Sequence, residues 1–166
     1  MDPGRRFFLR GCGTLSKPMA AKIPRPPWAL EESAFVQACT RCNACVEGCP
    51  QHILSCGDGG FPIVKFESNG CIECGECVAL CIPKALTRLP AQRPWAWHAE
   101  IDDRCLALRR IECRVCGEVC DAGAIRFRPS LGGVSLAVLS PQDCTGCGQC
   151  VPTCPTSAIK MVSPAA

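Results

Sequence analysis

The stretch CTRCNACVEGC at residues 39–49 decides how this chain folds. Its cysteines follow the spacing C-x2-C-x2-C-x3-C, which recurs in CIECGECVALC at residues 71–81 and in CTGCGQCVPTC at residues 144–154. A further run, at residues 105–120, keeps the last two gaps but stretches the first from two residues to seven. Sixteen of the 18 cysteines therefore lie in four runs of four.

Bacterial ferredoxins use this close spacing to hold [4Fe–4S] clusters through cysteine thiolates. Neighbouring thiols two or three residues apart are too crowded for a network of structural disulfides. Zinc sites usually separate two C-x2-C pairs by a long stretch, whereas these runs add the third and fourth cysteines at once. We therefore predict four [4Fe–4S] clusters, with zinc and disulfides as the alternatives. The candidate ligands are Cys39, Cys42, Cys45, Cys49, Cys71, Cys74, Cys77, Cys81, Cys105, Cys113, Cys116, Cys120, Cys144, Cys147, Cys150 and Cys154.

The composition agrees with a chain that folds around inorganic cofactors. Its 166 residues include 15 Gly, 15 Pro and no Tyr, and the hydrophobic content of 48% counts the cysteines. Apolar burial alone would stabilise such a chain weakly, so we expect metal ligation to contribute folding energy. The formal charge is +3 with neutral thiols, but thiolates and cluster cores would bring it to roughly −5. The apparent basicity gives no support to nucleic-acid binding.

A repeat extends beyond the cysteines. An apolar pair follows each run at the same offset, at Ile53-Leu54, Ala85-Leu86, Ala124-Ile125 and Ala158-Ile159. Residues 53–66 and residues 125–139 each read as a hairpin around a glycine-rich turn. We expect a loop-rich α+β fold of two tandem bacterial-type 2[4Fe–4S] ferredoxin-like modules. The expected divisions are a basic, Pro-rich tail at 1–36, a two-cluster module at 37–90, a linker at 91–97 and a second two-cluster module at 98–163.

In a two-cluster ferredoxin, the fourth cysteine of each run ligates the cluster of the other run. Carried over to this chain, the likeness implies ligand sets that cross between the runs and tie the halves of each module together. The implied sets are Cys39, Cys42, Cys45 and Cys81; Cys71, Cys74, Cys77 and Cys49; Cys144, Cys147, Cys150 and Cys120; and Cys105, Cys113, Cys116 and Cys154.

The run that begins at Cys105 is irregular. Seven residues separate Cys105 from Cys113, and we expect them to loop out and leave the adjoining cluster more exposed or more labile. Two of the seven, Arg109 and Arg110, are cationic. Positive charge beside a negatively charged cluster raises its reduction potential, and these side chains are also candidates to face a partner.

The N-terminal segment is basic. Residues 1–27 hold six Lys and Arg against Asp2 alone. The stretch RRFFLR at 5–10 is similar to a twin-arginine export signal, but Lys17, Pro18 and Lys22 interrupt the apolar stretch that a signal requires. No run of 18 apolar residues exists, so we expect no membrane span. We favour a cytoplasmic protein with an uncleaved tail over an exported one, the tail being a disordered leader or a docking arm.

The remaining candidate groups point to no enzyme. Cys12 and Cys56 stand outside every run and are predicted to be free thiols. His52 and His98 have no partner at ligand spacing. The sequence contains no phosphate loop, no flavin or nicotinamide fingerprint and no nucleophile motif. With a full set of four cysteines for every cluster, no iron is left open for a substrate.

Beyond the ligands, the chain resembles the NapF family, the ferredoxin-type accessory proteins of periplasmic nitrate reductase systems. The likeness runs from residue 5 to residue 161, and the stretched third run and the RPPW segment are its most specific parts. The residues that carry it are Arg5-Arg6, Arg25-Pro26-Pro27-Trp28, Cys39-Thr40-Arg41-Cys42, Gly59-Gly60-Phe61-Pro62, Cys105-Leu106-Ala107, Glu112-Cys113-Arg114-Val115-Cys116 and Phe127-Arg128-Pro129.

The resemblance implies a cytoplasmic protein that binds the catalytic subunit of the periplasmic nitrate reductase before export and assists its maturation. The alternative is an electron-transfer polyferredoxin, or an electron-transfer subunit of a redox complex. A labile cluster at the irregular run favours the first function, whereas four stable clusters with graded potentials favour the second.

Overall fold

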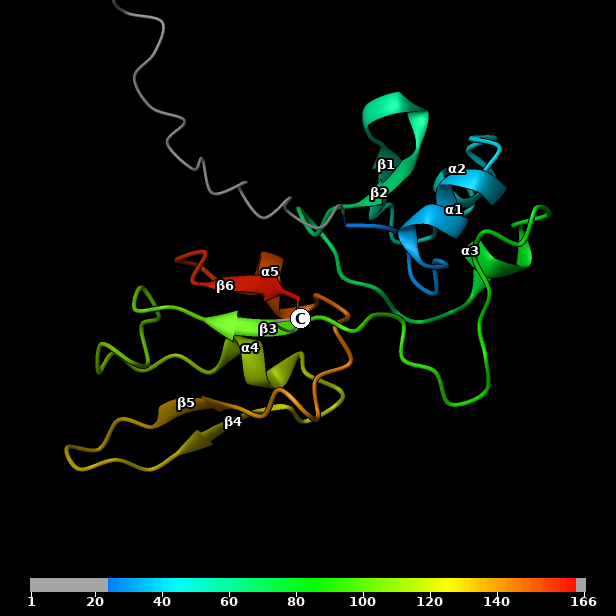
Figure 1. Ribbon diagram of the computed structural model, residues 1–166. Coiled ribbons are helices and arrows are strands. Elements are labelled where there is room, and N and C mark those ends of the chain that lie inside the picture. The colour runs from blue at the N-terminus through cyan, green and yellow to red at the C-terminus, as the bar shows by residue number, and fades with distance from the viewer. Residues whose placement is uncertain (1–23, 164–166) are drawn as a thin grey trace, which may run out of the picture.

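The computed structural model describes residues 24–163, which form two lobes of short helices and strands joined by long loops (Figure 1). The mixed helix and strand content agrees with the expected α+β class. The first lobe contains α1 (Glu32–Ala38), α2 (Ala44–Glu47), β1 (Leu54–Cys56), the 3-10 turn η2 (Asp58–Gly60), β2 (Pro62–Val64) and α3 (Glu76–Ala79). The second lobe contains β3 (His98–Ile101), α4 (Val115–Glu118), β4 (Ile125–Arg128), β5 (Leu136–Leu139), α5 (Cys150–Thr153) and β6 (Ile159–Val162).

Both predicted hairpins are present. Strand β1 pairs antiparallel with β2, with Leu54 opposite Val64. Strand β4 pairs antiparallel with β5, with Ile125 opposite Leu139. Each hairpin links the two cysteine runs of its lobe, so it holds the last cysteine of one run near the first cysteines of the next.

A second antiparallel pairing closes each lobe. In the second lobe β3 and β6 pair over four residues. In the first lobe the equivalent contact is reduced to a single bridge between Ala29 and Leu86. The segment before α1 therefore takes the place of the first strand of a ferredoxin-like unit.

This pairing makes residues 24–36 part of the first lobe, although the sequence grouped them with a tail. Trp28 is only 2% exposed, and its backbone N–H donates to the carbonyl of Pro94 at 2.9 Å. Its indole N–H donates to the carbonyl of Gln92 at 3.1 Å. Trp28 packs with Phe35 in the main apolar cluster of the lobe. Large aromatic side chains bury a large apolar area, so these two residues supply much of the core of this small lobe. The basic residues 1–23 of the predicted tail lie outside the described residues.

The same turn follows every cysteine run. The third residue after each last cysteine has a left-handed backbone, at His52, Lys84, Gly123 and Ser157. Its N–H donates to the carbonyl of that cysteine in all four cases, at 2.9 to 3.1 Å. The turn sends the following apolar pair inward, and every residue of the four pairs is buried. They are Ile53, Leu54, Ala85, Leu86, Ala124, Ile125, Ala158 and Ile159.

The two lobes meet through the connecting segment and the last cysteine run. Trp97 stacks on Trp95 with ring centroids 4.9 Å apart, and Phe66 packs edge-on against both. The indole N–H of Trp97 donates to the carbonyl of Gly146 at 2.9 Å. The connection is therefore packed against both lobes, which is more than a linker would require. Within residues 24–163, no helix is long and apolar enough to cross a membrane.

Candidate metal centres

Four cavities lie within the two lobes, and four cysteines line each one. Every cavity combines the first three cysteines of one run with the last cysteine of the other run in that lobe. The first lobe has one cavity lined by Cys39, Cys42, Cys45 and Cys81 and another lined by Cys49, Cys71, Cys74 and Cys77. The second lobe has one lined by Cys105, Cys113, Cys116 and Cys154 and another lined by Cys120, Cys144, Cys147 and Cys150.

Helix ends and the shared turn position these thiols. Helices α2, α3, α4 and α5 are single turns, and each contains the third cysteine of its run. Cys39 directly follows α1, where its N–H donates to the carbonyl of Phe35 at 2.8 Å. Since a one-turn helix is not stable by itself, these segments depend on the surrounding packing and on whatever fills the cavities.

Backbone amides point at several of the sulfurs. The N–H groups of Leu86 and Ala158, which follow the shared turn, donate to Cys81 Sγ at 3.4 Å and to Cys154 Sγ at 3.3 Å. The N–H of Ala99 in β3 donates to Cys144 Sγ at 3.4 Å. Donors of this kind stabilise negative charge on a thiolate and raise the potential of a cluster bound to it.

The regular runs share a second backbone feature. The residues on either side of the second cysteine are left-handed in all three, at Arg41 and Asn43, at Glu73 and Gly75, and at Gly146 and Gly148. Left-handed backbone at a non-glycine residue costs free energy. Its repetition at equivalent positions indicates that the loop must curl tightly to bring three thiols around one cavity.

Burial disfavours the charged form of the innermost thiols. It raises the pKa of Cys77 and of Cys150 to about 12, and nearby cysteines of the same lobe add to the effect. Burial also raises the pKa of the Cys45 thiol, to about 11. Such thiols are protonated at neutral pH unless a positive centre holds them as thiolates, so metal binding would have to displace their protons.

The thiol arrangement suits a polynuclear centre. In the part of the chain that the structure describes, no three His, Cys, Asp or Glu side chains come close enough to hold one metal ion. The described cysteines are all free thiols, and each set of four surrounds a shared space instead. A [4Fe–4S] core presents a separate iron to each of four thiolates, so the donor set and the cavity fit this cofactor.

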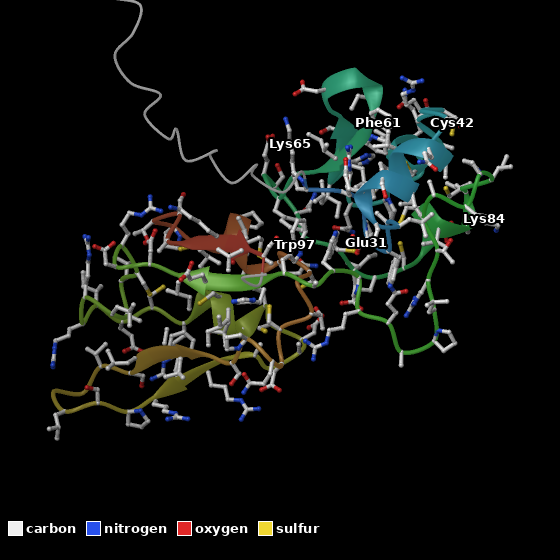
Figure 2. The ribbon with its side chains drawn as sticks, in the orientation of Figure 1. Glu31, Cys42, Phe61, Lys65, Lys84 and Trp97 are labelled. Atoms are coloured by element: carbon white, nitrogen blue, oxygen red, sulfur yellow. The ribbon has the colours of Figure 1, made fainter. Side chains whose placement is uncertain are left out.

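The irregular run differs from the expectation of greater exposure. None of Cys105, Cys113, Cys116 and Cys154 is exposed, whereas Cys42 and Cys74 of the first lobe are. Figure 2 shows Cys42 at the edge of the first lobe that faces away from the second. The reason is that the seven-residue insertion folds back over its site: Ala107 is 1% exposed and packs in one cluster with Cys105 and Ala158.

The other singled-out residues lie outside the cavities. Cys56 is exposed, and its thiol donates to Asn43 Oδ1 at 3.2 Å. His52 contributes a left-handed turn, and His98 pairs with Val162 in the β3–β6 ladder. Cys12 lies outside the described residues.

The sequence analysis did not identify the residues that join the lobes. The N–H of Cys71 donates to the carbonyl of Cys147 at 2.7 Å, so a run of the first lobe touches a run of the second. A Cβ at Gly70 would stand 2.6 Å from Cα of Gln149 and closer still to its backbone nitrogen. Only glycine fits there without a shift of one lobe. The tryptophans of the connection were the available signal, since aromatic residues are otherwise scarce in this chain.

The fold and the paired cavities define a ferredoxin-type iron–sulfur protein. The family described as "4Fe-4S dicluster domain" matches the chain twice, at residues 38–85 and 109–158, which cover more than half of it. The second match begins after Cys105, inside the insertion. Regular spacing would place the first cysteine of this run at residue 110, where the chain has Arg110, and Cys105 lines the cavity in its stead.

Whole-chain comparisons narrow the class. The chain is 44% identical over 159 residues to the ferredoxin-type protein NapF of Escherichia coli K12, covering 96% of this chain and 94% of that protein. It is 45% identical over 164 residues to NapF of Haemophilus influenzae, covering 95% and 92% of the two chains. The methylamine utilization ferredoxin-type protein MauM of Paracoccus denitrificans is 30% identical over 165 residues, covering 89% of this chain and 74% of that protein. This chain belongs to the NapF family of ferredoxin-type proteins.

Proposed function

We propose that the chain binds four [4Fe–4S] clusters, one in each cavity, through the four cysteines that line it. The observation that carries this proposal is the lining of the four cavities, each of which has four cysteines, three from one run and the last from the other run of its lobe. Two dicluster domains in one chain support the same number. The crossed sets make each lobe one folding unit, because neither run of a lobe completes a site without the other.

Bound clusters would supply one-electron chemistry. The chain's own residues hold the thiolates in place, donate backbone N–H groups to them and keep water from the buried sulfurs. The proposal leaves no iron without a cysteine ligand, which supports an accessory or carrier role over catalysis.

We further propose that the protein is cytoplasmic and binds the catalytic subunit of the periplasmic nitrate reductase before export, assisting its maturation. Membership of the NapF family supports this role, since the match to NapF proteins covers 95 to 96% of this chain.

Two measurements test these proposals in turn. Protein purified without oxygen should contain about sixteen iron and sixteen sulfide per chain, as four [4Fe–4S] clusters require. Stoichiometric zinc without sulfide would overturn the cluster proposal. The cluster-loaded protein should then capture the precursor of the nitrate reductase catalytic subunit from cytoplasm. It should not capture unrelated exported proteins. Absence of the precursor from the captured material would overturn the maturation role.

A second candidate function is electron transfer along the chain of sites. The hydrogen bond from Cys71 N–H to the carbonyl of Cys147 favours it, because it joins an inner site of each lobe directly. Rapid reduction of all clusters by a dehydrogenase, with four clusters that resist chelators, would support this function. Loss of one cluster to an acceptor protein would support the maturation role instead.

A further inference from the structure

The insertion of the third run forms one exposed surface with the tip of the β4–β5 hairpin. We call this the insertion surface and define it as Leu108, Arg109, Arg110, Ile111 and Leu131. Its apolar members are unusually open, with Ile111 53% and Leu131 92% exposed. The guanidinium of Arg110 reaches the carbonyl of Leu131 and so brings the insertion and the hairpin tip together, and exposed apolar patches mark interaction sites more often than ordinary surface does.

Hydrogen bonds hold the insertion in a fixed shape. The N–H of Arg109 donates to the carbonyl of Cys105 at 3.1 Å, and that of Ile111 to the carbonyl of Leu106 at 2.9 Å. The guanidinium of Arg110 donates to the carbonyl of Leu131 at 2.9 Å and so links the insertion to the hairpin tip. Buried Ala107 anchors the loop from below. A preorganised surface loses less entropy on binding than a mobile loop does.

The positive charge of the insertion surface is not neutralised within the described chain. The guanidinium of Arg109 donates only to the backbone carbonyl of Asp103 and that of Arg110 only to the carbonyl of Leu131, and among residues 24–163 neither forms an ion pair. Two of the neighbouring carboxylates have other partners: Glu112 lies 2.7 Å from Arg114, and Asp102 lies 2.7 Å from Arg104. Asp103 offers Arg109 its backbone carbonyl and forms no ion pair with it. Two guanidinium groups therefore remain for a negatively charged partner.

The location of the insertion surface gives it access to a metal centre. Leu106 of the insertion and Val115 line the cavity of Cys105 and Cys113. The other cavity of the second lobe adjoins the junction, where Phe66 and Trp97 cover the run at residues 144–150. Figure 1 shows the insertion and the hairpin tip at the end of the second lobe remote from the first. A partner that approaches the second lobe from outside meets the irregular centre first.

We propose that the insertion surface is the docking site for a protein partner that presents acidic side chains around an apolar patch. Under the proposed function, on which this identification rests, that partner is the catalytic subunit whose maturation the protein assists. Arg109 and Arg110 would pair with its carboxylates, and Leu108, Ile111 and Leu131 would fill its apolar patch. Arginine with adjacent apolar groups is a common composition of binding hot spots, and the charges would speed encounter.

The test uses full-length, cluster-loaded protein and the purified catalytic-subunit precursor, with the dissociation constant measured without oxygen by biolayer interferometry. Arg109→Glu with Arg110→Glu should weaken binding by about tenfold or more, as expected for reversal of paired interface charges. Arg109→Lys with Arg110→Lys retains the charge and should lose less. The matched control is Lys65→Glu with Lys160→Glu, which reverses two exposed charges outside the insertion surface and should leave binding unchanged; Lys65 is labelled in Figure 2.

A further variant, Leu131→Ser, should weaken binding without changing its dependence on salt, whereas charge reversal should reduce that dependence. Iron, sulfide and circular dichroism of every variant must match the wild type, which separates lost docking from lost folding. Equal binding by the wild type and the charge-reversed protein would overturn the proposal that the insertion surface is the docking site, while leaving the proposed function intact. Failure of the wild type to bind the precursor would overturn both.

Sedimentation is the last check. A wild-type dimer that the charge reversal dissociates would show that a second copy of the chain occupies this surface, which would contradict the proposal.

Discussion

The regular run at residues 39–49 and the irregular run at residues 105–120 reach a similar cavity by different local structures. In the regular run the residues around the second cysteine, Arg41 and Asn43, are both left-handed. In the irregular run the residue after Cys113 has φ −131°, and the left-handed residue is Arg110 in the insertion. Each run nevertheless places its first three cysteines around one cavity, together with the last cysteine of the other run in its lobe.

The difference shows that the positions of the thiols around a cavity are conserved between the two runs, whereas the backbone conformation between the cysteines is not. A two-residue gap forces a tight curl, whereas a seven-residue gap lets the chain form its own turns and a buried contact through Ala107. The longer loop then covers its thiols and carries exposed arginines on its outer side. The regular run has no segment that could cover its thiols, so Cys42 stays exposed.

The largest expected effect comes from removing a central thiol from each kind of run. Cys45→Ser in the first lobe and Cys116→Ser in the second should each abolish one cluster, removing about a quarter of the iron and sulfide. Each should also lower stability markedly, because ligation contributes folding energy. Iron and sulfide analysis with thermal unfolding checks this, and Cys56→Ser is the matched control. Unchanged iron in Cys116→Ser alone would break the equivalence of the two kinds of centre.

The next effect concerns the junction between the lobes. Among the residues that the structure describes, the junction contacts the regular run at residues 144–154 and does not contact the irregular run. Gly70→Ala would place a Cβ against the backbone of Gln149. We expect the free energy of unfolding to fall by about 1–3 kcal/mol, as overpacking usually costs, and the connection at residues 88–97 to become easier to cleave. Limited proteolysis and denaturant unfolding measure both. Ser68→Ala, at an exposed position two residues earlier, should change neither; equal cleavage of the two variants would argue against a packed junction.

A smaller effect should be confined to the irregular centre. Ala107→Val adds two methyl groups at a position that is 1% exposed, and overpacking of this size costs about 1 kcal/mol or more. One cluster should then be lost faster to a chelator while the others are unaffected, as followed by the absorbance of the bound clusters. Leu108→Val, at the next and exposed position, is the control. Faster loss of all clusters would show that the insertion does not act locally.

The smallest effect is electrostatic. Arg109→Gln with Arg110→Gln removes two positive charges beside one cluster, which should lower its reduction potential, on the order of tens of millivolts given solvent screening. Potentiometric titration followed by electron paramagnetic resonance measures the shift, with Lys65→Gln and Lys84→Gln as the control pair. A shift of the same size in both variants would mean that the arginines act through net charge and have no local role.

Much of the fold was predictable from local pattern. The shared offset of the apolar pairs indicated a repeated local structure after each run, and the glycine-rich turns predicted the two hairpins, because both depend on residues a few positions apart. The irregular centre was predicted to be more exposed or more labile. The greater lability stays a prediction, whereas the greater exposure was wrong for its cysteines, since the packing of Ala107 against Ala158 joins segments far apart in the sequence. For the same reason the RPPW segment was grouped with a tail, although Trp28 is part of the core.

The sequence by itself determined the chemistry: cysteines two or three residues apart are neighbours in any fold, so the runs specify iron–sulfur ligation before the chain has a shape. The tertiary structure decided which last cysteine stands beside each group of three, that Gly70 and Trp97 lock a run of the second lobe against the first, and that the insertion covers its own centre. These features depend on packing between distant segments, and side-chain volume and steric fit determine such packing only once the chain has folded.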